Sequence, residues 1–345
     1  MQEALYSRFI IDGVPRELTP AALLAPVFEK TPEPCAPGGT VIDETIDPAP
    51  GPIVLDPKGI GEYLEAQAGV QRSIPVPFAA PCTRARIAEA LTDTVLRVGN
   101  LRLDDMPLTV KWNFNPGKVG DMSAFYASVE AAADYIDSLG TVLRRCVCES
   151  GPFDVKVATP FSGAPLLVDD VLHPDRNSWV VYVPFDTSDY RLGGSLLSQA
   201  LGLRGGTAPQ VADADYFIDC FELVRELAED GILLSAGTVG AGGLAATLRN
   251  MTREGIGVHA DVSDVLRAGG GADALKVYFS ELPGIVMQVR DSDFDYIDAE
   301  FILQDVAYFP LGHPLPGGGL RLEATDKPGI QTILESLMQN AEGED

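Results

Sequence analysis

The sequence predicts an α/β protein, in the broad sense that includes α+β folds, built from two modules. Three observations lead to this prediction. The chain has 345 residues, which is enough for about two domains of ordinary size. Apolar residues make up 46% and charged residues 22% of the chain, as is typical of folded globular proteins. Segments with helical periodicity alternate with short apolar segments, as layered structures of helices and sheets require.

The start of the chain is rich in proline: we place an N-terminal arm at residues 1–56 and predict mostly extended arm or loop over residues 13–60. Residues 13–60 contain ten prolines and show little periodicity. Proline fixes φ and lacks an N–H donor, so it disfavours regular helices and central strands. The first module should therefore begin near Pro57.

We place the first module at residues 57–174. Apolar residues recur at every third or fourth position from Ala85 to Val98, after Thr83 as an N-cap, and this spacing predicts a helix. The remaining elements are an alternating strand at 108–112, a helix at 123–139 that Gly140 closes, and a short β-branched strand at 141–147.

We place the second module at residues 175–330. The continuous apolar run from Ser178 to Phe185 is typical of a strand buried on both faces. Helices are predicted at 192–200, at 215–228 and from Gly242 onward, and strands at 232–234 and 284–289. Residues 331–345 form an acidic tail that we expect to fray.

The charge balance excludes two classes of partner. Lys and Arg number 25 and Asp and Glu number 50, so the formal net charge is −25 at pH 7. Such a surface repels phosphate backbones and anionic lipids, and we expect neither nucleic acid nor membrane binding. The first twelve residues lack the apolar segment of a secretion signal, and no apolar run reaches the roughly 18 residues of a membrane span. We expect a cytoplasmic protein.

The strong motifs of nucleotide and metal chemistry are missing. The chain has no P-loop, no GxGxxG after a strand, no HExxH and no CxxC. The three histidines, at positions 173, 259 and 313, pair visibly with no nucleophile, so structural roles are favoured. The five scattered cysteines predict neither a disulfide framework nor a zinc site. Cys146 and Cys148 share a strand face, and we expect two ordinary buried thiols.

Two glycine pairs stand where a ligand could bind. Gly193–Gly194 and Gly242–Gly243 each follow a predicted strand and precede a predicted helix. Free N–H groups and the helix dipole at such a turn can hold a phosphate. Tight turns also explain these glycines and are the favoured explanation.

A run of ordered segments resembles one known family. The segments VYVPFDTSDYRLGGSLLSQALG, DADYFIDCFELVRELAEDGILLSAGTVGAGGLAATLRNM and VYFSELPGIVMQV resemble the second synthetase half of large-type phosphoribosylformylglycinamidine synthase. RIAEALTD, LTVKW and DPKGIGEYLEAQ resemble further segments of it, so the likeness covers roughly residues 27–325. The resemblance implies a two-module fold like that of aminoimidazole ribonucleotide synthetase, here with an abbreviated N-terminal module. It also implies ADP or ATP with Mg²⁺ between the modules, and a place in purine biosynthesis.

The chain departs from this family at positions that carry chemistry. Where the family has HDxSxGG with a Mg²⁺-binding aspartate, this chain reads GTVGAGG at 237–243, and a lysine-containing GKDS segment reads CVCE at 146–149. Mg²⁺ needs hard oxygen ligands, and a threonine supplies no charge. Between Val70 and Pro75 the family has several additional strands, including the segment with another Mg²⁺-binding aspartate, and from Gly61 to Thr92 this chain has no aspartate. The nucleotide cleft is therefore expected to be degraded.

A few residues remain as candidates for this cleft. Glu89 and Asp93, four positions apart on one predicted helix, are candidate cation contacts, with a solvated helix face as the equally favoured explanation. For the other candidate nucleotide contacts, turns, a loop cap or a salt bridge are slightly favoured: Gly193, Gly194, Ser195, Gly242, Gly243 and Glu281. No residue is predicted to be catalytic.

Three functions remain open. The losses fall on charged positions, while apolar positions such as Phe217 and Leu244 are intact; this favours a non-catalytic relative with a structural or protein-binding role and no bound cofactor. The alternative is a subunit of an ATP-dependent C–N ligase that binds ADP or ATP with Mg²⁺. A binder of another small molecule in the same cleft is a third possibility. Because the family buries its N-terminal sheet against a homologous sheet, we expect a homodimer or a heteromeric protein partner if an apolar sheet face is exposed.

Overall fold

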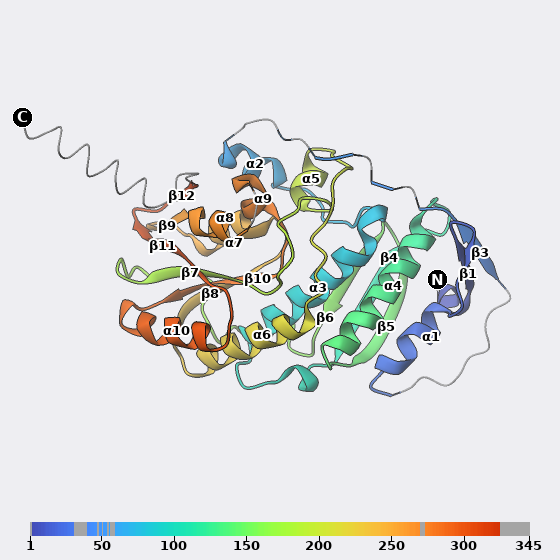
Figure 1. The fold of residues 1–345 in the computed structure, drawn as a ribbon, viewed down its shortest axis with the longest axis horizontal. Helices are drawn as coiled ribbons and strands as arrows, with labels where there is room; N and C mark the ends of the chain where they lie inside the picture. The colour runs from blue at the N-terminus through green and yellow to red at the C-terminus, as the bar shows by residue number, and fades with distance from the viewer. Residues whose placement is uncertain are drawn as a thin grey trace, which may run out of the picture.

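The computed structural model describes residues 2–30, 40–46, 48–49, 51–53, 55, 59–269 and 273–324. Its strands form three mixed sheets: a six-stranded sheet in the order β12-β9-β11-β7-β10-β8 and three-stranded sheets in the orders β5-β4-β6 and β2-β1-β3. Figure 1 shows the six-stranded sheet at one end of the molecule, β4, β5 and β6 near the middle, and β1 and β3 at the other end.

The elements alternate along most of the chain. The helices are α1 (Pro20–Leu24), α2 (Ile60–Gln67), α3 (Ala79–Val95), α4 (Asp121–Ser138), α5 (Leu196–Ala200), α6 (Ala214–Glu229), α7 (Gly243–Met251), α8 (Ser263–Ala268), α9 (Ala274–Phe279) and α10 (Asp291–Leu303). The strands are β1 (Arg8–Ile11), β2 (Val14–Pro15), β3 (Val41–Glu44), β4 (Leu108–Phe114), β5 (Leu143–Ser150), β6 (Asp154–Ala158), β7 (Trp179–Pro184), β8 (Leu233–Val239), β9 (Ile256–Asp261), β10 (Gly284–Val289), β11 (Phe309–Pro316) and β12 (Leu320–Glu323).

The central strand of the β5-β4-β6 sheet shows why this part of the sequence folds as it does. Leu108, Val110, Trp112 and Phe114 are fully buried, and the residues between them remain partly exposed. This alternation places one apolar face of the strand in the core. Trp112 donates a hydrogen bond from its indole N–H to Ser128 on α4 at 2.8 Å, so the buried ring also satisfies its polar atom.

The six-stranded sheet is covered on both faces. Its central strands β7 and β10 are buried along almost their whole length, as the continuous apolar runs predicted. One face contributes to an apolar cluster with α3, α4, α6 and α10, which also includes the β4 side chains. The opposite face packs in a second cluster with α2, α7 and α9. The six-stranded sheet and the β5-β4-β6 sheet therefore share one continuous core through α3, α4 and α6.

The proline-rich start of the chain differs from the prediction of an extended arm. Strand β1 pairs in parallel with β3 and antiparallel with β2, and Phe9 of β1 contacts Tyr126 of α4 with ring centroids 5.0 Å apart. The carboxylate of Glu44, at the end of β3, accepts hydrogen bonds from the N–H groups of Gly120 and Ser123 at the start of α4. Within these strands the one proline is Pro15, the last residue of β2, so the segment pairs and packs as a small sheet.

Other differences concern the limits and number of elements. The helix predicted from Ala85 begins at Ala79. Thr83 therefore lies inside this helix and donates its hydroxyl to the carbonyl of Ala79 instead of acting as an N-cap. The sequence did not indicate β6, β9, β11, β12, α8, α9 or α10. Strand β11 contains three prolines and is held by its pairing with β7 and β9. The acidic tail lies outside the described residues.

The face of the β5-β4-β6 sheet opposite α4 is polar. On β4 this face carries Thr109, Lys111 and Asn113, which are half-buried, and Lys111 lies directly opposite Lys156 of β6. None of the large apolar side chains that are exposed in the described residues lies on these strands. The exposed apolar face that would favour pairing with a second copy is thus not found on this part of the chain, and homodimer formation stays a prediction. In the same ranges, no helix combines the length and hydrophobicity needed to cross a membrane.

Candidate functional site

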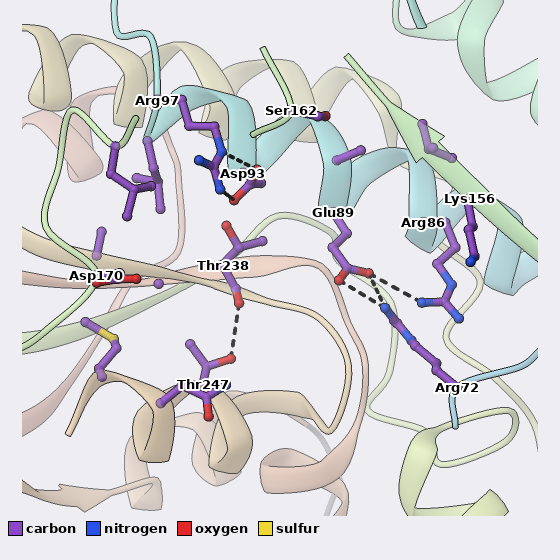
Figure 2. A pocket seen from close by; sticks show the side chains of 18 of the residues that line it. Arg72, Arg86, Glu89, Asp93, Arg97, Lys156, Ser162, Asp170, Thr238 and Thr247 are labelled. Carbon is purple, nitrogen blue, oxygen red and sulfur yellow. Dashed lines mark hydrogen bonds and ion pairs between the residues drawn. The ribbon is translucent and has the colours of Figure 1, made fainter. Parts of the chain in front are cut away.

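A cavity of about 700 Å³ lies where α3 and β6 face β8 and α7. Helix α3 contributes Arg86, Glu89 and Asp93, Arg97 follows the end of this helix, and β6 contributes the consecutive residues 154–157. Thr238 on β8 and Thr247 on α7 close the opposite side, as Figure 2 shows. The volume lies within the roughly 300–1,000 Å³ range of small-molecule sites.

At one end of this cavity, Arg72 connects two carboxylates from distant parts of the chain. Its guanidinium donates from Nη1 to both oxygens of Glu89, at 3.0 and 2.7 Å, and from Nη2 to Glu281 at 2.9 Å. Arg72 lies in the segment between α2 and α3, Glu89 on α3, and Glu281 just before β10. The two carboxylates and the arginine form a continuous ion network (Figure 2 shows its Glu89 side).

The carboxylate of Glu281 also binds backbone N–H groups beside the two glycine turns. Its Oε1 accepts a hydrogen bond from the N–H of Leu196 at 2.8 Å and from the N–H of Gly242 at 3.0 Å. Leu196 is the first residue of α5, and Gly242 immediately precedes α7. A carboxylate is favourable at such free N–H groups because they carry partial positive charge. The donors that the sequence suggested for a phosphate are thus bound to an anion of the protein itself.

The charges of this network stabilise one another. Burial alone would lower the pKa of Arg72, but the neighbouring charges of Glu281 and Glu89 raise it above its ordinary value. Burial would raise the pKa of Glu281, but Arg72, Arg86 and the two backbone N–H donors lower it. Both groups are therefore ionised at neutral pH.

Glu89 and Asp93 both line the cavity, and each is bound by an arginine. Asp93 accepts a hydrogen bond from Nε of Arg97 at 2.7 Å, an ion pair across one helical turn. The structure thus places the two predicted cation contacts on one side of the cavity and supplies each with a guanidinium. Gly240 permits the position of Glu89, because a Cβ at Gly240 would lie 2.2 Å from Glu89 Oε1.

The glycines at 193 and 194 lie beside a much smaller void, of about 20 Å³. This is room for about one water molecule. A Cβ on Gly193 would lie 2.5 Å from the carbonyl carbon of Thr207, and Gly194 has a φ of +76°. Ser195 caps α5, since its Oγ accepts a hydrogen bond from the N–H of Ser198. Close packing and turn geometry account for these residues.

Backbone conformation and close packing also account for Gly242 and Gly243. Their φ angles are +81° and +71°, and a Cβ on Gly243 would lie 2.7 Å from the carbonyl oxygens of Tyr278 and Ser280. Thr238 stands at the position of the family's aspartate and lines the cavity. Its side-chain oxygen is buried and has no hydrogen-bond partner.

The residues at this point do not suit magnesium. Mg²⁺ requires free oxygen ligands in near-octahedral geometry, whereas the guanidinium of Arg72 lies between the carboxylates of Glu89 and Glu281. Thr238 offers a neutral hydroxyl. Within the described ranges, no group of three or more His, Cys, Asp and Glu side chains is arranged to hold a metal ion.

Sequence reasoning missed the basic residues of the site. Arg72, Arg86, Arg97 and Lys156 come from three segments whose proximity follows from the tertiary fold. An isolated arginine in a sequence carries no motif. The one available signal was the position of Arg72 next to the place where the family's additional strands are missing.

Among the described residues, the cysteines and histidines lie outside the cavity lining. Burial raises the pKa of Cys146, and it raises that of Cys148 to about 12. His313 contacts the ring of Trp179, with centroids 4.2 Å apart, and a ring nitrogen lies 2.9 Å from the carbonyl oxygen of Ser178. Cys35 lies outside the described residues.

Comparisons with known proteins give this architecture a family context. Residues 185–298 match the family model described as the C-terminal domain of AIR synthase related proteins. Human phosphoribosylformylglycinamidine synthase is 27% identical over 248 residues, which cover 67% of this chain and 18% of the human protein.

Two solved structures share the fold. The structure of Thermotoga maritima PurL complexed with FGAR has a TM-score of 0.52 and 12% identity, and the match covers 77% of this chain and 48% of PurL. PurLQS from the same organism has a TM-score of 0.50 and 13% identity, covering 77% of this chain and 46% of the other. The chain spans less than half of each of these relatives. It resembles the AIR synthase-like half of phosphoribosylformylglycinamidine synthase.

Proposed function

We propose that this chain is a non-catalytic relative of the AIR synthase-like half of phosphoribosylformylglycinamidine synthase, with a structural or protein-binding role. The observation that carries the proposal is the position of the Arg72 guanidinium between Glu89 and Glu281. A protein-borne cation stands where two carboxylates would otherwise be free to contact a metal ion. A protein-borne anion, Glu281, likewise stands at the N–H groups where a phosphate would otherwise bind.

This arrangement supports a cleft that holds its shape without a ligand. Arg72 and Glu281 connect the segment before α3, helix α3 itself, and the starts of α5 and α7. A Mg²⁺ ion that contacts both carboxylates would have to displace the guanidinium of Arg72 from them. Removing one partner from a buried ion pair is strongly unfavourable.

One observation favours the alternative, a nucleotide-binding subunit of an ATP-dependent ligase in purine biosynthesis. The cavity of about 700 Å³ remains open beside the ion network and has basic side chains at its rim. Under this alternative, bound ADP or ATP would require Arg72 to turn away. Under either function, we propose a homodimer or a heteromeric protein partner.

Calorimetric titration with ADP and ATP, with and without Mg²⁺, tests the proposal. We expect no binding up to millimolar nucleotide, either for the wild-type protein or for Glu89→Gln. Micromolar binding that depends on Mg²⁺ and weakens in Glu89→Gln would overturn the proposal and establish the alternative. Light scattering on the same samples gives the oligomeric state in which the result holds.

A further inference from the structure

The large cavity runs along the edge of a strand. Successive side chains of a strand point to opposite faces of its sheet, yet four consecutive residues of β6, from Asp154 to Val157, all line the cavity. One cavity can reach both kinds of side chain only by passing along the backbone edge between them. This edge is the last in the order β5-β4-β6.

Most of that edge has no partner strand in the described part of the chain. Strand β6 pairs with β4 on its other side. At its start, the N–H of Ile74 donates to the carbonyl of Phe153 at 3.0 Å, so the Arg72–Ile74 segment covers only the first position. Unpaired N–H and C=O groups along a strand edge are a template for an added strand.

The charge beside this edge favours an acidic occupant. Lys156 of β6 is exposed and forms no ion pair with any described residue, and it lies directly opposite Lys111 of β4. Lys111 is neutralised by Glu149 at 2.5 Å. Arg86 contacts carboxylates only at 3.4 and 4.0 Å, and Figure 2 shows it beside Lys156 at the same end of the cavity. In a chain of net charge −25, two cations with incompletely used donors at a cavity rim mark a place for a carboxylate.

The rest of the cavity lining is mixed. Leu96, Leu166, Ala236 and Met251 are apolar, whereas Asp93, Asp170, Thr238 and Asn250 are polar. An extended segment that pairs with β6 would direct alternate side chains to different walls, where its apolar residues would contact the first of these groups.

We propose that the free edge of β6 accepts an extended acidic segment of a partner protein as an additional strand, with a carboxylate of that segment bound between Lys156 and Arg86. This inference rests on the protein-binding role proposed above and names its surface and its kind of partner. Backbone hydrogen bonds to β6 supply affinity, and the two cations supply the preference for acidic sequences.

Three capped pentapeptides test this proposal: VEVEV, VKVKV, and VEVEV with alternate backbone nitrogens methylated. Fluorescence anisotropy measures binding to the full chain without nucleotide, and hydrogen exchange with mass spectrometry locates it. We expect VEVEV to bind with a dissociation constant below about 1 mM, roughly tenfold tighter than the other two, and to protect those amides of β6 that do not point toward β4, which alternate along the strand. Lys156→Glu should reverse the preference between VEVEV and VKVKV.

Arg145→Glu is the matched control, because Arg145 is an exposed cation on β5 of the same sheet and does not line the cavity. Arg145→Glu should leave unchanged the preference for VEVEV over VKVKV and over the methylated peptide. The proposal is overturned if β6 gains no protection at millimolar VEVEV, if the methylated peptide binds equally well, or if Lys156→Glu has no effect. A dimer that dissociates in Lys156→Glu would also overturn it, in favour of a second copy at this edge. None of these results depends on nucleotide binding. The proposal for the β6 edge and the proposed loss of nucleotide chemistry can therefore be refuted separately.

Discussion

Arg72 and Glu281 lie 209 positions apart in the sequence, and the guanidinium of the first donates to the carboxylate of the second at 2.9 Å. The same carboxylate accepts the N–H groups of Leu196 and Gly242. One cation and one anion of the chain therefore hold together the segments that form one end of the large cavity. The predictions below follow from this contact and from the packing around it.

Arg72→Ala should expose a latent site for divalent cations. Without the guanidinium, Glu89 keeps the 4.0 Å contact with Arg86 and Glu281 keeps its two backbone N–H donors, and we expect a loss of about 2–3 kcal/mol in unfolding free energy, less than for a fully buried pair. Mn²⁺ should then stabilise the variant and leave the wild-type protein unchanged. Thermal unfolding with and without Mn²⁺ measures both effects.

The control for this experiment is Arg84→Ala, which removes an ion pair with the exposed Asp134. It should cost less than about 1 kcal/mol and create no response to Mn²⁺. Adding Glu89→Gln to Arg72→Ala should abolish the stabilisation by Mn²⁺. If the double variant still responds, the metal binds elsewhere and the latent site does not exist.

Glu281 should make the folded protein sensitive to acid. Its pKa is lowered in the folded state, chiefly by Arg72 and Arg86 against the opposing effect of burial, whereas an unfolded Glu titrates near about 4.3. Between these two pKa values the unfolded chain binds the extra proton, so stability rises with pH. The contribution is complete above about 4.3 and is lost as the pH falls through the folded pKa.

Glu281→Gln should therefore destabilise the protein most at pH 7 and progressively less below pH about 4. Urea unfolding from pH 3 to 8 measures the difference from the wild-type protein. Glu254→Gln, at an exposed carboxylate without an ion pair to any described residue, should show a small difference at every pH. A pH-independent effect of Glu281→Gln would mean that its hydrogen-bond geometry matters and its charge does not.

Gly243→Ala should destabilise the protein through packing and not through a lost ligand. Both Gly243 and Gly231 have positive φ, +71° and +67°, but only at Gly243 would a Cβ meet backbone oxygens, at 2.7 Å. We expect Gly231→Ala to cost about 1 kcal/mol for its backbone conformation and Gly243→Ala at least about 3 kcal/mol. Equal costs, measured by urea unfolding, would contradict the close approach of the α7 turn to Tyr278 and Ser280.

The thiols of Cys146 and Cys148 should be unreactive in the folded protein. Burial raises the pKa of both, that of Cys148 to about 12, and the thiolate is the reactive form. In a Cys35→Ser background, alkylation at pH 8 mapped by mass spectrometry should label Cys148 at least about a hundredfold more slowly than in the unfolded chain. Rapid labelling of both residues, or a disulfide between them under mild oxidation, would instead indicate a redox pair.

The local pattern of the sequence predicted most elements around the site. Continuous apolar runs predicted β7 and β10, helical spacing predicted α4 and α6, and Gly140 ends α4 with a φ of +67°. Strand β11, with three prolines, was missed because its pairing with β7 and β9 outweighs its weak intrinsic preference. The small N-terminal sheet was missed for a similar reason, since β1 and β3 are separated in sequence and each needs the other.

The candidate site could be predicted only in part. The resemblance to the family brought Glu89, Asp93, Glu281 and the glycine turns together, and the structure places Glu89 and Glu281 on one arginine. Nothing in the sequence indicated Arg72, because ion pairs between distant segments leave no periodic trace. The same holds for the free edge of β6, which depends on the order of strands in a sheet.

The sequence by itself determined the apolar frame, the acidic charge and the absence of the motifs that bind Mg-nucleotide, since these are properties of local pattern and composition. The tertiary structure decided which charges meet. Whether Glu89 and Glu281 are free to hold a metal ion depends on a guanidinium that the fold brings to within 3.0 Å of both. Chain folding alone sets that distance, because the attraction between charges acts over a few ångströms in space and is indifferent to their separation along the chain.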